Sequence, residues 1–165
     1  MEDIINLIEN YSKTSILNRA AHYRASRDAL IKHYWLGIPT ILISTAIGTS
    51  IFASLRTDPT EGLKIIVGFV SFLSAVLSSL QTFFKFSEVA EKHRVAGAAY
   101  GDMKRKLDIL KLQYSMKEHT SREDALKELK LVSEALSELA KESPGIPDKA
   151  FKQAKKIEEE NLVQK

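Results

Sequence analysis

Two long runs without charge constrain this chain more than any other feature. The first covers residues 34–55 and the second covers residues 65–84, so each has about 20 to 22 residues without Asp, Glu, Lys or Arg. At about 1.5 Å of rise per residue, a helix of this length spans about 30 Å, the thickness of the hydrocarbon core of a bilayer. Charged residues make up 27% of the whole chain, so they are strongly segregated into the flanks of these runs.

The two runs have an alternative interpretation as a buried helical hairpin in a soluble bundle. Helices of such a bundle are usually amphipathic, with charged side chains on the outer face. Neither run carries a charge on any face. The pattern therefore predicts transmembrane helices at residues 33–55 and 65–85, joined by an external turn at residues 56–64. Pro59 and Gly62 are typical of such a turn.

The distribution of lysine and arginine predicts the orientation of the hairpin. These residues are frequent before the first run and after the second, whereas the turn contains only Arg56 and Lys64. Because cytoplasmic flanks carry the excess of positive charge, both termini are expected in the cytoplasm. The turn has too few residues to form a receptor domain outside the membrane.

Composition and missing motifs argue against several classes of function. The chain has no cysteine, which excludes disulfides, thiolate zinc sites and cysteine nucleophiles. The formal net charge of +3 is too small to indicate nucleic-acid binding. No phosphate loop, HExxH or GxSxG motif is present. We therefore expect a protein that is not an enzyme and that needs no cofactor or metal ion.

Each predicted span carries a stripe of small and polar residues on one helical face. The residues of both stripes recur at intervals of three or four, which places the members of a stripe on the same side of their helix. Small residues and hydroxyls favour close packing between membrane helices, and a polar face in an oligomer can also line a pore. The sequence leaves both readings open. The stripe residues are Thr40, Ser44, Ser71, Ser74, Ser78 and Gln81.

The remaining residues predict a cytoplasmic bundle of helices. Residues 1–32, 86–116, 120–142 and 148–160 form the expected helical segments, and the second span is expected to continue into residues 86–116 as one helix. Apolar residues follow a heptad from Val89 to Tyr114 and again from Ala125 to Leu139, so these two segments should pack on one another. The apolar face near Ile4 and Ile8 would lie either on the membrane or on this bundle. Together these elements predict one all-α domain over residues 1–165, with a two-helix transmembrane hairpin and long cytoplasmic helical extensions.

A group of polar residues is predicted next to the membrane. His22 and His93 could face each other between the segments that flank the two spans. A metal site of the ExxH type would need Glu at position 90, where the chain has Ala90. We therefore expect a structural or gating network, made of Arg19, His22, Glu88, Glu91, His93, Arg94 and Tyr100.

The segment after the second span resembles a known family. FSEVAEKHRVAGAAYGDMKRKL contains the pattern HR-x-AG-x-x-Y at His93, Arg94, Ala96, Gly97 and Tyr100. With RAAHYRAS upstream and ESPGIPDKAF downstream, it resembles the SLATT family, the SMODS- and SLOG-associating two-transmembrane effector domains, over roughly residues 10–155.

The resemblance implies a membrane effector of bacterial antiphage defence, located in the inner membrane. Such an effector would oligomerise, form a pore or disrupt the membrane, and kill the cell before the phage matures. A separate sensor or nucleotide-synthesising protein would activate it, and its direct partners would be the lipid bilayer and further copies of itself. The alternative is a non-catalytic anchor or scaffold that holds a cytoplasmic partner enzyme.

Overall fold

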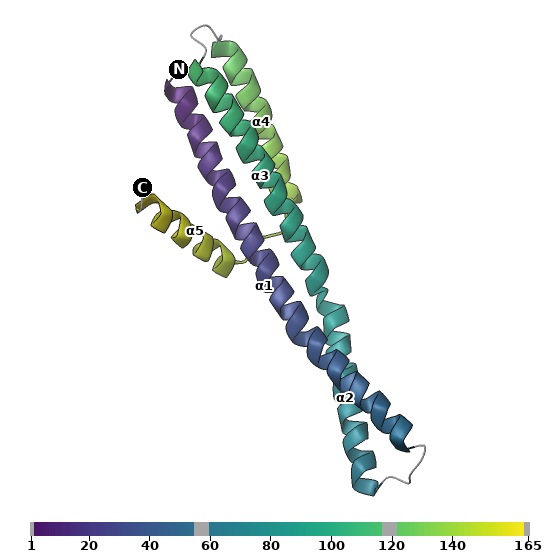
Figure 1. Cartoon of the computed structure of the whole chain (residues 1–165). Helices are drawn as coiled ribbons and strands as arrows, with labels where there is room; N and C mark the ends of the chain where they lie inside the picture. The colour runs from purple at the N-terminus through teal and green to yellow at the C-terminus, as the bar shows by residue number, and fades with distance from the viewer. Residues whose placement is uncertain (1, 55–59, 117–121, 164–165) are drawn as a thin grey trace. The chain divides into compact units, whose positions relative to one another are not determined.

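The computed structural model describes residues 2–54, 60–116 and 122–163, and every regular element in these residues is an α-helix (Figure 1). The helices are α1 (Glu2–Ser54), α2 (Glu61–Phe84), α3 (Phe86–Met116), α4 (Arg122–Glu142) and α5 (Asp148–Val163). Four of the turn residues, 56–59, and the first two residues of the expected segment 120–142 lie outside the described residues. The chain divides into a bundle unit, residues 1–27 and 90–165, and a hairpin unit, residues 28–89. The all-α prediction is confirmed.

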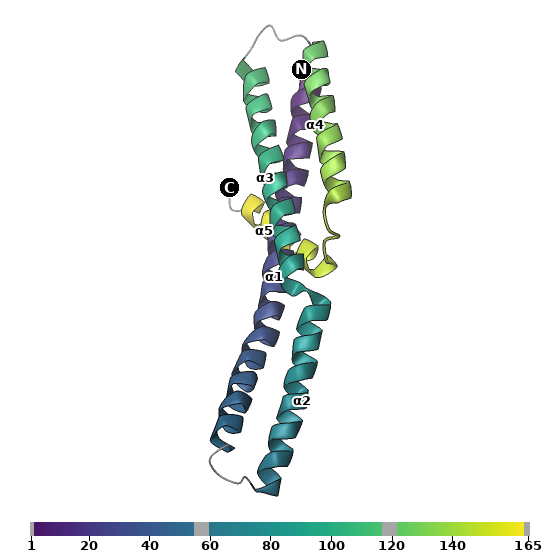
Figure 2. The same cartoon turned by 90° about the vertical axis from the view of Figure 1, so that its right-hand side faces the viewer.

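The bundle unit contains three helical segments side by side, from α1, α3 and α4 (Figures 1 and 2). Their apolar core includes Ile4 and Ile8 of α1, which are 3% and 1% exposed. The N-terminal apolar face therefore packs on the bundle, which resolves the alternative that the sequence left open. The other residues of this core cluster are Leu107, Tyr114, Ala125 and Leu129.

The heptad pattern of α3 and α4 predicts this core well. His93, Ala96, Tyr100, Leu107 and Tyr114 are all buried positions of the first seam. The seam of α4 contributes its first two members to the core, and its later members are half-buried. Polar contacts join the segments at their edges: the Tyr11 hydroxyl of α1 donates to the Ser133 hydroxyl of α4, and Lys111 of α3 pairs with Glu9 of α1.

The hairpin unit pairs the second part of α1 with α2. Both α1 and α2 contain a stretch long and apolar enough to cross a membrane, and only 6% of each stretch is buried within the chain. A core helix of a soluble protein would be mostly buried, so these faces need apolar surroundings that the chain itself does not supply. Trp35 and Phe83 are 75% and 79% exposed, and large aromatic side chains of this kind are enriched at the two interfaces of a membrane.

The junction between α2 and α3 differs from the expected continuous helix. Lys85 has φ 45° and ψ 41°, a left-handed conformation, and α2 ends at Phe84. The Lys85 amide still donates to the Gln81 carbonyl, and the Lys85 carbonyl accepts from Val89. The chain therefore turns through one left-handed residue, a conformation that costs a non-glycine residue about 1–2 kcal/mol.

At residue 85, glycine should stabilise the fold more than alanine does, which is the reverse of their usual order inside a helix. Inside a helix, glycine is about 1 kcal/mol less favourable than alanine. At a left-handed residue it is the more favourable of the two. We expect Lys85→Gly to unfold at a higher temperature than Lys85→Ala in the same micelles, by a free energy of about 1 kcal/mol. Both variants lose the ion pair of Lys85 with Glu88, so the comparison isolates the backbone. A more stable Lys85→Ala would mean that residue 85 is helical.

Candidate functional site

The hairpin unit brings the two predicted polar stripes into contact. The Ser44 hydroxyl lies 2.8 Å from the Ser74 hydroxyl, and either group can donate. Ser74 is 8% exposed. A second contact lies seven residues away on each helix. A Cβ built on Gly37 would lie only 3.1 Å from Nε2 of Gln81, so the lack of a side chain at Gly37 makes room for that amide. These residues therefore pack the two helices of one chain against each other.

Other stripe residues bond to their own helix. The Thr40 hydroxyl donates to the Leu36 carbonyl at 2.7 Å, and the Ser71 hydroxyl donates to the Val67 carbonyl at 2.7 Å. This bonding to the preceding turn satisfies a hydroxyl donor without a partner helix. Ser78 is exposed. The stripe is therefore divided between a part that holds the hairpin together and a part, at Ser78, that faces outward from the chain.

Gly37 and Gly48 offer a matched test of hairpin packing. Leucine at Gly37 must displace the Gln81 amide, whereas no atom lies within 4 Å of a Cβ at Gly48. Forcing a side chain into a packed site typically costs about 1–3 kcal/mol. We expect Gly37→Leu to lower the thermal stability of the hairpin in micelles by about that amount, while Gly48→Leu leaves it unchanged or raises it. Equal effects of both substitutions would contradict the packing assigned to Gly37.

The bundle unit contains a buried pair of imidazoles, as the sequence predicted. Nδ1 of His22 on α1 lies 3.0 Å from Nδ1 of His93 on α3, and the two residues are 1% and 3% exposed. The Tyr100 ring stacks on the His22 ring, with 5.5 Å between centroids and 20° between planes. Because one Nδ1 must donate and the other accept, at least one imidazole is neutral in this arrangement.

Burial governs the titration of this pair. It lowers the pKa of His22 from 6.5 to about 4, with a further contribution from charge on His93, and it lowers the pKa of His93 as well. Burial also raises the pKa of the Tyr100 phenol, and the nearby Ser143 hydroxyl partly offsets that rise. All three side chains are therefore held in their neutral forms at pH 7.

The other members of the predicted network lie apart from this pair. Arg94 pairs with Glu91 along α3 at 2.6 Å, and both side chains are more than half exposed. Glu88 pairs with Lys85 within the hairpin unit. Arg19 packs its side chain over Gly101 and lies 5.8 Å from the centroid of the Tyr23 ring. The network is thus a buried core of His22, His93 and Tyr100 with exposed ion pairs that stabilise it little.

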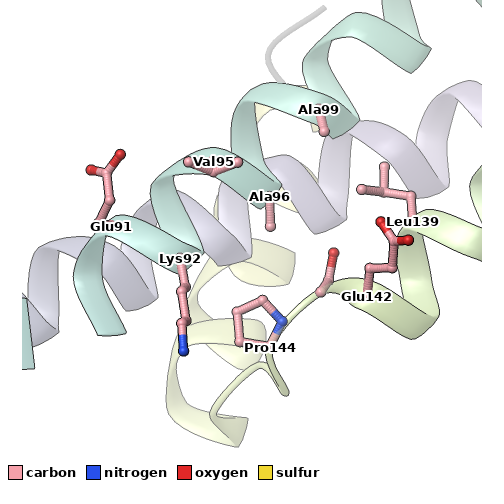
Figure 3. Close-up of a pocket in the computed structure, with 9 residues that line it drawn as sticks. Glu91, Lys92, Val95, Ala96, Ala99, Leu139, Glu142 and Pro144 are labelled. Carbon is pink, nitrogen blue, oxygen red and sulfur yellow. The ribbon is translucent and has the colours of Figure 1, made fainter. Parts of the chain in front are cut away.

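A cavity of about 640 Å³ opens between α3 and the end of α4 (Figure 3). Ala96 and Ala99 of α3 and Leu139 of α4 line it, together with Pro144 in the connection to α5. Ser143 also lines it, but the Ser143 hydroxyl is shielded from solvent and makes no well-formed hydrogen bond within the described parts of the chain. The charged residues Glu91, Lys92 and Glu142 also line the cavity. In Figure 3 the Glu91 carboxylate points away from Pro144, whereas the Lys92 side chain extends beside it.

The sequence did not predict this cavity, because the cavity forms only where α3 packs near the end of α4 and the segment that contains Pro144. The alanines at positions 96 and 99 are a weak signal for open space, since small side chains leave room beside a helix. No group of three or more His, Cys, Asp or Glu side chains in the described residues is arranged to hold a metal ion.

Comparison with known proteins identifies the family. The profile of SMODS and SLOG-associating 2TM effector domain family 4 matches residues 6–162, nearly the whole chain. The chain belongs to this family. No curated protein and no solved structure matches the chain significantly. The two-transmembrane description agrees with the two apolar stretches of α1 and α2, so the protein is a membrane protein.

Acidification should weaken the bundle of this SLATT protein through the buried imidazoles. The unfolded chain takes up a proton at His22 near pH 6.5, whereas the folded chain does so only near pH 4. The folded state therefore loses stability as the pH falls between these values, by an amount on the order of 2 kcal/mol. We expect the protection factors of the amides around His22 and His93, each taken relative to the intrinsic exchange rate at the same pH, to fall over this range.

Two variants control this measurement. His22→Gln should remove most of the pH dependence while keeping a polar group at the position. His33→Gln removes a histidine of the same helix that is not part of the pair, and it should leave the pH dependence unchanged. An unchanged slope in His22→Gln would show that another group causes the effect.

Proposed function

We propose that this protein is a membrane-acting effector of bacterial antiphage defence. Copies of the chain assemble in the inner membrane and form a pore or disrupt the bilayer, which kills the infected cell before the phage matures. Both termini lie in the cytoplasm. The protein acts without catalysis, and a separate protein of the associated defence system triggers it.

The observation that carries this proposal is the hairpin unit of a chain that belongs to a family of effector domains. Its helices leave most of their apolar surface uncovered, and their outward faces carry hydroxyl-bearing residues as well as large apolar ones. One hairpin cannot enclose a water-filled path, so a pore requires several copies. Because Ser44 and Ser74 are occupied with each other, the outward-facing Ser78 is the stripe residue best placed to line a path or to contact a neighbour.

The distribution of basic residues beside the apolar stretches supports the orientation with both termini in the cytoplasm. Lys32, Lys85 and Lys92 flank the apolar stretches at the end that leads to the bundle unit, and the turn at the other end has few basic residues. Lys32 also lies 5.8 Å above the Phe86 ring, a cation–π contact that suits an interface between lipid and water.

A scaffold is the second candidate, because the family name itself records an association with SMODS and SLOG proteins. In this function the stripes only pack, and the bundle unit holds a partner enzyme at the membrane. Exposed Leu126 and Leu131 on α4 offer apolar surface for such docking. The two functions differ in autonomy: a pore depolarises the membrane by itself or after a trigger, whereas a scaffold needs the activity of its partner.

Membrane potential separates these functions. A voltage-sensitive dye should report depolarisation, before viability falls, in bacteria that express the chain together with its native neighbouring genes during phage infection. Ser78→Leu should reduce this ion flux about tenfold or more, because leucine removes a polar position and narrows the path. Ser79→Leu is the matched control, since Ser79 is also exposed but lies about 100° further around the helix.

Each result has a defined meaning. A steady potential in cells whose membranes contain the assembled wild-type protein would reject the pore and favour the scaffold. Normal flux through assembled Ser78→Leu would reject Ser78 as part of the path. Assembly of each variant is checked by chemical crosslinking in isolated membranes, so that a folding failure is not read as a blocked pore.

A further inference from the structure

A second hollow lies on the bundle unit, in the groove between α3 and α4. Its volume is about 360 Å³. Ile109 and Leu110 form the α3 wall, and Leu131 and Val132 form the α4 wall. Ile109 is 58% exposed and Leu131 is 60% exposed, although both helices are otherwise rich in charge. Single exposed apolar side chains are ordinary, but apolar side chains gathered around a groove are typical of a contact surface.

The exposed residues of this groove lie off the heptad seams. Of the nearby seam positions of α3, Leu107 and Tyr114 are buried in the core, and Leu110 is half-buried between the core and the groove. Ile109 is displaced from that seam, and Leu112, at 57% exposure, extends the same outer face. Their hydrophobicity therefore does not contribute to the bundle core and needs another explanation.

Opposite charges stand on the two walls of the groove. Lys106 lies on the α3 wall and Glu128 lies on the α4 wall. The neighbours of Lys106 are paired within α3, Lys104 with Asp108 and Arg105 with Asp102, whereas Lys106 makes no ion pair in the described residues. Glu128 accepts a hydrogen bond from the Tyr114 hydroxyl at 3.1 Å, and among these residues it has no cationic partner.

We propose that this groove, defined by Lys106, Ile109, Leu131 and Glu128, is a contact surface between two copies of this chain. The α3 and α4 helices run antiparallel within the bundle unit (Figure 2). A two-fold axis along the groove lays α3 of one copy over α4 of the other. Ile109 then packs on Leu131 of the second copy, and Lys106 meets the acidic α4 wall. The apolar and basic groups of each α3 wall thus contact the apolar and acidic groups of the α4 wall of the other copy, as a self-complementary interface requires.

The size of the groove defines how the contact works. Seven residues line the groove, fewer than the roughly 20–30 residues that each partner contributes to a stable soluble interface. In a membrane, however, the attached hairpins confine the copies to two dimensions and raise their effective concentration. The hairpins therefore bring the copies together in the membrane, and the groove contact sets their specificity and register. This inference rests on the proposed function, because that function requires several copies in one membrane.

Disulfide trapping tests the pairing directly, because the chain has no native cysteine. Ile109→Cys is expressed with one affinity tag and Leu131→Cys with another, in the same cells, and the isolated membranes are oxidised. We expect a disulfide between the two differently tagged chains, and at least about fivefold less product between two copies of the same variant. Disulfide formation needs Cα atoms within about 7 Å, so it reports a specific register.

Two comparisons make this test decisive. Leu126→Cys replaces Leu131→Cys as the matched control, because Leu126 is 47% exposed on the same helix and does not line the groove. Lys106→Glu or Glu128→Lys alone should reduce the specific product severalfold, and both substitutions in one chain should restore it. Glu128→Lys also removes the acceptor of Tyr114, so the thermal stability of each variant is measured alongside.

The outcomes separate this inference from the proposed function. Equal product with Leu126→Cys, no rescue by the charge exchange, or a product with a different protein in place of the second copy would overturn the assigned contact. Ion flux measured in the same vesicles gives the second readout. Flux without the specific product leaves the pore standing and rejects this contact. In vesicles from infected cells that also express the native neighbouring genes, the specific product without flux supports the contact and rejects the pore.

Discussion

The bilayer's lack of hydrogen-bonding partners is the constraint on which the rest of this structure depends. A chain that enters the hydrocarbon must satisfy its backbone polar groups internally, and an uncharged run of about 20 residues does so as a helix. The same requirement explains the hydroxyls of the hairpin unit, since Thr40 and Ser71 donate to carbonyls of the preceding turn and Ser44 pairs with Ser74. Polar residues are thus accommodated in an apolar segment without any partner from outside the chain.

The bundle unit follows a different rule, because its helices are amphipathic. Its segments carry charges on their outer faces and bury a heptad seam, and the N-terminal isoleucines complete the core around Leu107 and Leu129. Within this core the neutral pair of His22 and His93 is the polar exception. The two imidazoles hydrogen-bond to each other, and burial lowers the pKa of both. Protonation at low pH therefore destabilises the bundle unit, whereas a purely apolar core would not respond to pH.

The proposed assembly draws on both the hairpin unit and the bundle unit. The hairpin offers apolar faces to lipid and an outward serine, and the bundle offers a groove with opposite charges on its two walls. A left-handed residue, Lys85, ends α2 before α3 begins. Because that conformation is unfavourable for lysine, the local backbone stores free energy that a change at this residue could release.

The sequence by itself determined the all-α class, the two apolar helices and the heptad seams, because charge segregation and the 3.6-residue period are local properties. It suggested that His22 and His93 could face each other, but their contact is made only by the packing of α1 on α3. It could not decide which stripe residues face inward. Tertiary contacts alone place Ser74 against Ser44 and leave Ser78 outside, and they move Ile4 and Ile8 from a possible membrane surface into the bundle core. The groove of Ile109 and Leu131 is likewise a tertiary feature, since each residue becomes part of a surface only when α3 and α4 lie side by side.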